Sequence, residues 1–180
     1  MRSVLDEAGM MGVIFRWILR RFVHVEVGAG APSCVAMATV EVDTRLGQIR
    51  VLQISNGLAV GRIATPALAR SQVEGAVIQG IGYALYETRQ LDPLSGQVLT
   101  IGLEDYRIPG IADTPEIDIH FADSGFEHVP GGSVGLGEIA TLPVAAAIAN
   151  AVCHATGVRP HALPLRPDRV LAMLKSGAPS

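Results

Sequence analysis

The sequence predicts an α+β fold, with strands and helices mixed along one chain rather than strictly alternating. Apolar and polar residues alternate over residues 33–53 and 116–121, which is typical of half-buried strands. Residues 66–87 and 139–155 form longer apolar segments, which are typical of helices. The 180 residues are 49% hydrophobic and only 4% aromatic, which indicates one domain with a core of Val, Ile, Leu and Ala.

A β-hairpin is expected first. Residues 33–42 alternate, residues 43–47 have the composition of a turn, and the alternation resumes over residues 49–53. A glycine-containing loop is expected over residues 56–62. The sequence therefore predicts two antiparallel strands before the first helix.

The first helix is expected to begin at Thr65 and Pro66, an N-cap residue followed by proline at the first helical position, and to run to about Glu87. Three glycines lie inside it, Gly75, Gly80 and Gly82. Each interior glycine costs about 0.5–1 kcal/mol relative to alanine, so they indicate a close approach by backbone or ligand. Tight packing on a sheet and contact with a ligand explain them about equally well.

Further elements follow in the second half of the chain. Residues 91–101 predict a second hairpin around a turn, and residues 116–121 predict a strand followed by a polar loop. Residues 139–155 predict an alanine-rich helix that Gly157 closes. Residues 168–175 predict a short final helix.

The N-terminal segment carries no clear functional signal. Residues 10–19 are apolar but short and follow acidic residues, so they predict neither a signal peptide nor a membrane span of about 20 residues. Arg16, Arg20 and Arg21 beside Trp17 fit a basic amphipathic helix that lies on a membrane or a partner. A helix that packs its own apolar face, or a poorly ordered start, is the favoured interpretation of the same residues.

Composition excludes several classes of function. The formal net charge of −3 argues against a nucleic-acid partner. Cys34 and Cys153 are too few for an iron–sulfur cluster or a structural zinc site, and the five histidines follow no metal-ligand spacing. We therefore expect no metal ion held by side chains of this chain.

Glu138 is the most suggestive candidate for catalysis. It follows Gly135, Leu136 and Gly137 and precedes the apolar segment, so a small backbone presents one carboxylate at the start of the expected helix. Two interpretations are open. Glu138 is either a general base or an acidic residue that complements the helix dipole, an effect of about 0.3–1 kcal/mol.

Four blocks, taken together, resemble one family. They are residues 72–82 (QVEGAVIQGIG), 106–109 (YRIP), 135–138 (GLGE) and 145–152 (AAAIANAV). Their order and spacing are similar to those at the C-terminal end of the molybdenum-binding large subunit of the xanthine dehydrogenase and aldehyde oxidase family. The resemblance implies that residues 29–180 are a C-terminal fragment of the second molybdopterin-binding domain type, with residues 1–28 unassigned.

The resemblance also implies an activity and a cofactor. The family consists of oxidoreductases that hydroxylate an aldehyde or an N-heterocycle with oxygen from water, and the glutamate matching Glu138 takes the proton from that oxygen. Gln72 matches a glutamine that hydrogen-bonds the pterin, and Gly135, Leu136 and Gly137 match backbone beside the metal. The implied cofactor is molybdopterin with molybdenum, in its cytosine dinucleotide form.

Three positions differ from the family pattern. Ala59 and Thr65 stand where the family usually has Asp and Asn in the loop before the first helix, and Val134 stands where many relatives have Lys. These differences affect the expected contacts to the cofactor and leave the resemblance intact.

Family large subunits are several times longer than this chain. The resemblance therefore implies partners: the remainder of the large subunit, a [2Fe-2S] small subunit and an FAD subunit, together with a small-molecule substrate. A non-catalytic remnant or assembly module that keeps the fold is the alternative. The expected compartment is the cytoplasm, or the periplasm by export together with a partner.

Overall fold

The computed structural model describes residues 32–177. Their strands form one sheet in the order β1–β2–β3, with β1 (Ser33–Asp43), β2 (Gln48–Ala59) and β3 (Glu116–Ala122). β1 and β2 are antiparallel, whereas β2 and β3 are parallel. The helices are α2 (Pro66–Leu85), α3 (Val144–Thr156) and α4 (Pro167–Gly177). This mixture of strands and helices confirms the predicted α+β class.

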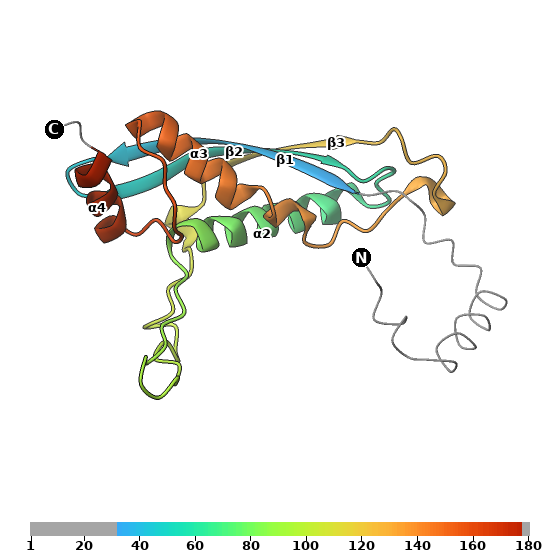
Figure 1. Ribbon diagram of the computed structural model, residues 1–180. Coiled ribbons are helices and arrows are strands. Elements are labelled where there is room, and N and C mark those ends of the chain that lie inside the picture. Colours follow the sequence, from blue (N-terminus) through green and yellow to red (C-terminus); the bar gives the residue numbers. More distant parts are fainter. Residues whose placement is uncertain (1–31, 178–180) are drawn as a thin grey trace, which may run out of the picture.

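The helices α2 and α3 lie along one face of the sheet (Figure 1). Side chains of β1 alternate between exposed and half-buried, as expected for a sheet with one covered face. Most of the core consists of aliphatic side chains from β2, α2 and α3, and Ala140, together with Val170 of α4, is buried with them. The fully buried aliphatic side chains of those three elements include Ile54, Leu58, Val73, Val77, Ile81, Val144, Ile148 and Val152. The opposite face exposes Val35 and Met37, so the described residues leave that face uncovered.

The first hairpin is confirmed. Asp43 stabilises its turn, because its Oδ1 accepts hydrogen bonds from the backbone N–H groups of Arg45 and Leu46 at 2.8 and 3.0 Å. Gly47 follows with a φ of +70°, which favours glycine. A Cβ on Gly47 would lie 2.8 Å from Leu171 Cγ, so α4 packs directly on this turn.

β2 is longer than the sequence predicts. Residues 56–59 belong to the strand, so the loop expected over residues 56–62 is wrong in its first half. Asn56 pairs with both neighbouring strands, and its side chain is buried. A Cβ on Gly57 would come within 3.2 Å of Val35 Cγ1. Glycine here reflects close packing between strands rather than a turn.

The second predicted hairpin is an arm, residues 88–108, that projects from the body of the molecule (Figure 1). Its turn is present, since the Gly96 N–H donates to the Asp92 carbonyl at 2.8 Å. Strand pairing is limited to one bridge between Leu91 and Val98. The predicted strands are therefore wrong, because an isolated pair of strands with no covering layer is only marginally stable.

The helix predicted over residues 139–155 is divided into two elements. Ile139–Thr141 forms a 3-10 turn, η4, and α3 begins after Pro143. Proline explains the division, because it lacks a backbone N–H and its ring clashes with the preceding turn of an α-helix. The expectation that Glu138 opens the apolar helix is thus corrected, since Glu138 precedes a 3-10 turn. α3 ends as predicted at Gly157, which has a φ of +74°.

The remaining elements agree with the sequence analysis. α2 begins after the extended Thr65, although the Thr65 side chain makes no capping hydrogen bond. β3 and α4 lie where a strand and a final helix are expected. The polar loop contains one short 3-10 turn, η3 (Pro130–Gly132). The alternatives for residues 10–22 lie outside the described residues.

One segment of the described residues, Ile139–Thr156, is long and apolar enough to cross a membrane by length and composition alone, with a mean hydropathy of 1.5. Helices of a protein core meet the same criterion. Pro143 divides the segment, and Val144, Ile148 and Val152 are buried against the sheet. These three side chains belong to the core, and 22% of the segment is buried in the structure.

Candidate functional site

Gln72 and the Gly-x-Gly-Glu turn meet in the fold. Gln72 lies in the second turn of α2, and its Nε2 donates a hydrogen bond to the Gly137 carbonyl oxygen at 3.1 Å. The two residues are 65 positions apart in the sequence. The structure therefore brings together candidate residues from two separate sequence blocks.

The backbone of the turn is open on one side. Gly135 and Gly137 are exposed, and a Cβ on either would meet no atom within 4 Å. Gly137 has a φ of +43°, which L-residues rarely adopt, so its conformation favours glycine. Leu136 is half-buried and packs against the core. The Leu136 side chain thus anchors the turn, while the two glycines leave space beside it.

Glu138 is exposed at the end of this turn. Its side chain makes no hydrogen bond or ion pair with any residue from 32 to 177. Its backbone carbonyl accepts a hydrogen bond from the Thr141 N–H at 3.0 Å, which starts η4. The carboxylate is therefore available to a ligand, and the described residues do not shield it from water.

Two further polar side chains, neither of them predicted from the sequence, hold the same segment. Asn56 Nδ2 donates to the Ala140 carbonyl oxygen at 3.1 Å, and the Thr141 hydroxyl donates to Gln79 Oε1 at 3.5 Å. A polar residue between Ile54 and Leu58 is the signal that points to Asn56, because strand residues facing a core are normally apolar. Gln79 gives no comparable signal.

The loop before α2 lies beside the loop that leads to Gly135. The Arg62 N–H donates to the Gly132 carbonyl at 2.8 Å, and the Val134 N–H donates to the Val60 carbonyl at 3.0 Å. Gly61 has a φ of +73°, and a Cβ there would clash with the Gly132 carbonyl. Two of the positions that differ from the family pattern, Ala59 and Val134, are consequently close to one another and to the candidate site.

The three glycines inside α2 have different surroundings. A Cβ on Gly80 would lie 2.6 Å from the Val144 Cβ, so Gly80 permits close contact between α2 and α3. Gly82 is similarly close to the side chains of Glu87 and Pro109. Gly75 has no neighbour within 4 Å and lies three residues after Gln72, on the same face of the helix. Packing thus explains two of the glycines, and the third lies beside the candidate site.

The exposed groups around Gln72 fit the edge of a pterin. The amide of Gln72 has two donors and an acceptor, of which one donor is used by Gly137. A Cβ on Gly75, Gly135 or Gly137 would meet no atom within 4 Å, so the backbone at these positions is open to a ligand. Within residues 32–177, no three His, Cys, Asp or Glu side chains are close enough to hold a metal ion.

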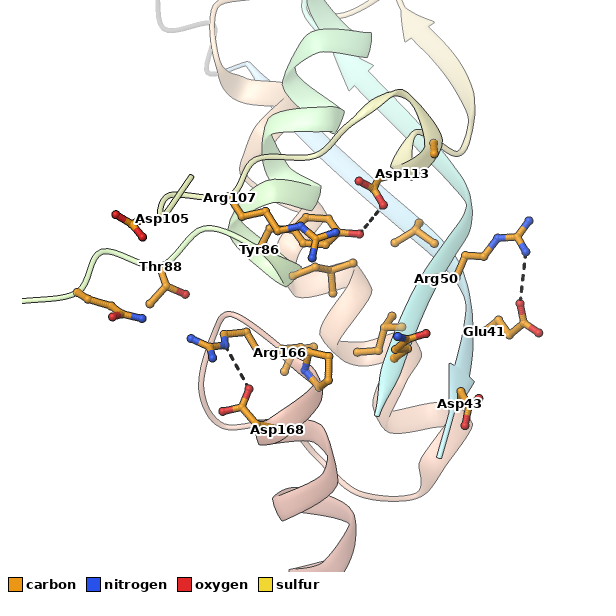
Figure 2. Close-up of a pocket in the computed structure, with 18 of the residues that line it drawn as sticks. Glu41, Asp43, Arg50, Tyr86, Thr88, Asp105, Arg107, Asp113, Arg166 and Asp168 are labelled. Carbon is orange, nitrogen blue, oxygen red and sulfur yellow. Dashed lines mark hydrogen bonds and ion pairs between the residues drawn. The ribbon is translucent and has the colours of Figure 1, made fainter. Parts of the chain in front are cut away.

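A separate cavity of about 1140 Å³ lies at the other end of α2 (Figure 2). Tyr86 stands in its wall, with its hydroxyl donating to Asp113 Oδ1 at 2.9 Å and the Arg107 guanidinium 4.8 Å from its ring centre. Burial, followed by the bond to Asp113, raises the pKa of Tyr86 to about 12. With a rise of 1.5 Å per residue, Gln72 is about 20 Å away along the helix, so the cavity is distinct from the candidate site.

Several known proteins are similar to this chain in sequence and in fold. The pattern of the molybdopterin cofactor-binding domain family matches residues 23–115. A xanthine dehydrogenase molybdenum-binding subunit of Escherichia coli O157:H7 is 40% identical over 129 residues, which are 72% of this chain and 17% of that protein. An aldehyde oxidoreductase molybdenum-binding subunit of Escherichia coli K12 is 38% identical over 136 residues, which are 75% and 19% of the two chains.

A solved structure gives the same result. The aldehyde oxidoreductase of Desulfovibrio gigas superposes with a TM-score of 0.70 at 32% identity, over 78% of this chain and 15% of that one. The chain thus spans less than a fifth of the length of these relatives. From the matched pattern, these identities and the shared fold, the chain belongs to the molybdopterin cofactor-binding domain family, as part of a molybdenum-binding subunit of the xanthine dehydrogenase and aldehyde oxidoreductase type.

Proposed function

We propose that this chain is the part of a molybdenum hydroxylase that supplies the general base and one side of the cofactor site. The reaction class is hydroxylation of an aldehyde or an N-heterocycle with oxygen from water. The observation that carries this proposal is the hydrogen bond between Gln72 and Gly137, which joins the cofactor-contact residue to the turn that presents Glu138.

Each residue has a separate role in this proposal. Gln72 binds the pterin edge with its remaining donor and its acceptor, and Gly135 and Gly137 allow the cofactor to approach the backbone. When bound, the molybdopterin supplies the redox chemistry and the metal that activates oxygen. We further propose the cytosine dinucleotide form of this cofactor.

Glu138 takes the proton in the proposed reaction. Its carboxylate has no partner among the described residues, so its oxygen atoms are free to accept a proton from the attacking oxygen. Efficient transfer needs a site from which water is excluded, and Glu138 is exposed in this chain. The cover therefore comes from the upstream part of the large subunit.

The remaining partners are part of the same proposal. Electrons leave through a [2Fe-2S] subunit and an FAD subunit, because the two cysteines of this chain are too few to hold a cluster. The complex works in the cytoplasm, or in the periplasm if a partner carries the export signal.

Co-expression with the reading frames that flank its gene tests the proposed function. We expect the chain to co-purify with stoichiometric molybdenum and a cytidine nucleotide, and the complex to oxidise an aromatic aldehyde. Glu138→Gln should retain the metal and lose activity by about 100- to 10,000-fold, the usual effect of removing a general base. Glu41→Gln, which changes an exposed carboxylate at the cavity end of the sheet, is the matched control.

Two results would contradict the proposal. A complex that forms without molybdenum would favour the non-catalytic assembly module. A Glu138→Gln complex that is as active as wild type would show that another group takes the proton.

A further inference from the structure

Asn56 is a polar residue in the middle of the hydrophobic core. It is 0% exposed and lies on β2 between Ile54 and Leu58, which are also buried. Burying an amide without hydrogen bonds is costly, so a buried asparagine needs specific partners. Its two partners belong to different parts of the fold.

The first partner is Cys34 on β1. Its thiol is the donor to Asn56 Oδ1. Burial raises the pKa of the Cys34 thiol, which therefore keeps its proton and remains a donor. This contact orients the amide, because Nδ2 points away from Cys34 when Oδ1 faces the Cys34 thiol.

The second partner is the backbone of η4. Asn56 Nδ2 donates to the Ala140 carbonyl oxygen at 3.1 Å, two residues after Glu138. This bond crosses 84 positions of sequence and joins the centre of the sheet to the turn that carries the candidate base. The Ala140 side chain is itself fully buried, so the contact lies inside the core.

The η4 turn has few bonds of its own. The Thr141 N–H donates to the Glu138 carbonyl at 3.0 Å, whereas the bonds from the Ile139 N–H to the Leu136 carbonyl and from the Leu142 N–H to the Ile139 carbonyl are both 3.3 Å long. Bonds of this 3-10 type have poorer geometry than those of an α-helix, and short 3-10 turns depend on their surroundings. Pro143 also prevents the turn from continuing directly as an α-helix.

We propose that Asn56 is a positioning residue for Glu138. Asn56 holds η4 on the sheet through the Ala140 carbonyl, and Cys34 orients the Asn56 side chain. The Glu138 side chain begins two residues before the tethered carbonyl, so the tether fixes the point from which its carboxylate extends. Gln72 holds the preceding residue, Gly137, from the other side. The catalytic part of this inference rests on the proposed function, whereas the tether itself does not.

Amide hydrogen exchange of the full chain, measured by NMR, tests the tether. Asn56→Val keeps a strand-forming side chain in the core and removes both hydrogen bonds. We expect the Thr141 and Leu142 amides, which are bonded within η4, to exchange about tenfold faster relative to the amides of α3. Ile54→Val, a core change on the same strand, is the matched control. It should change the exchange rates of the η4 and α3 amides by the same factor.

A second pair of variants tests the role of Cys34 and remains informative if Asn56→Val does not fold. Cys34→Val removes the donor, whereas Cys34→Ser replaces it with a hydroxyl. We expect faster exchange of the η4 amides in Cys34→Val and near-normal exchange in Cys34→Ser. Equal changes in η4 and α3 for every variant would overturn the proposal, since Asn56 would then contribute only to general stability.

The enzymatic consequence is measured in the co-expressed complex. A displaced Glu138 lowers kcat, by up to about 100-fold for a displacement near 1 Å, with KM little changed. An Asn56→Val complex with unchanged kcat would overturn the catalytic part even if exchange is faster. A wild-type complex without activity would instead contradict the proposed function. The exchange measurement would then still test the tether by itself.

Discussion

The side-chain amide of Gln72 lies 3.1 Å from the carbonyl oxygen of Gly137, and this contact ties α2 to the turn that ends at Glu138. Both groups are exposed, so the hydrogen bond competes with water and adds little to stability. Its main effect is geometric, because it fixes the distance between the first turns of a rigid helix and a short glycine-rich segment.

Replacing Gln72 should therefore separate cofactor binding from stability. We expect Gln72→Ala to change the free energy of unfolding by less than about 1 kcal/mol in urea denaturation of the chain. The molybdenum content of the co-expressed complex should fall. Gln90→Ala, on the exposed arm, is the control and should change neither quantity. Full molybdenum content in Gln72→Ala would argue against its role as a cofactor contact.

Two glycines of α2 should respond in opposite directions to alanine. Gly80→Ala places a methyl group against Val144, and overpacking of this kind costs about 1–3 kcal/mol. Gly75→Ala meets no neighbour and should stabilise the helix by about 0.5–1 kcal/mol. Thermal or urea denaturation of the two variants measures both effects. A destabilised Gly75→Ala would indicate contacts at this position that the described residues do not make.

Gly61 and Gly96 form a second matched pair, since both have a positive φ near +70°. Alanine at either position costs about 1–2 kcal/mol for its backbone conformation. Gly61→Ala also clashes with the Gly132 carbonyl and approaches the Phe126 Cβ to 2.9 Å, whereas Gly96→Ala meets open space. Gly61→Ala should thus lose clearly more stability in urea denaturation. Equal losses would mean that the loop shifts to accommodate the methyl group.

The raised pKa of Tyr86 makes the free energy of unfolding depend on pH in the alkaline range. Its pKa rises from 10.0 to about 12, through burial first and the hydrogen bond to Asp113 second. The folded chain thus keeps the phenolic proton at pH values where the unfolded chain loses it. The resulting stabilisation is complete below pH 10.0 and is lost as the pH rises from 10.0 to about 12.

Tyr86→Phe tests this dependence. The urea midpoint of the wild type should fall more steeply between pH 10.0 and about 12 than that of Tyr86→Phe. Tyr83→Phe, which removes the hydroxyl of an exposed tyrosine in the last turn of α2, is the control variant. Parallel slopes for wild type and Tyr86→Phe would show that the phenol has the same proton affinity in both states.

The regular elements are predictable because their signals are local. The turn after Asp43 and the Pro66 start of α2 are each specified by a few neighbouring residues. The division of the 139–155 segment has a local cause in Pro143, but the alanine-rich composition around it favours one continuous helix. The arm shows the opposite case, in which strand-like sequence forms no strands because none of residues 32–177 covers it.

The candidate site is less predictable, because its contacts join distant segments. Spacing alone does not bring Gln72 to Gly137; the family resemblance selects both blocks, and the fold brings them together. Asn56 escapes selection because residues 56–62 have the composition of a loop. Its polar side chain between two apolar neighbours is informative only once the strand is known to continue.

The parallel pairing of β2 and β3 has a consequence for the order of folding. The chain between these strands contains all of α2 and the arm. Pairing of β2 with β3 therefore requires closure of a long loop, and the entropy lost in that closure precedes the stabilisation that the pairing gives. The β1–β2 hairpin needs only a short turn and is expected to form early. The turn at Glu138 follows β3 in the chain and docks on Asn56 at the centre of the sheet. We expect this turn to be among the last segments to become ordered, and the first to become disordered when the β2–β3 pair opens.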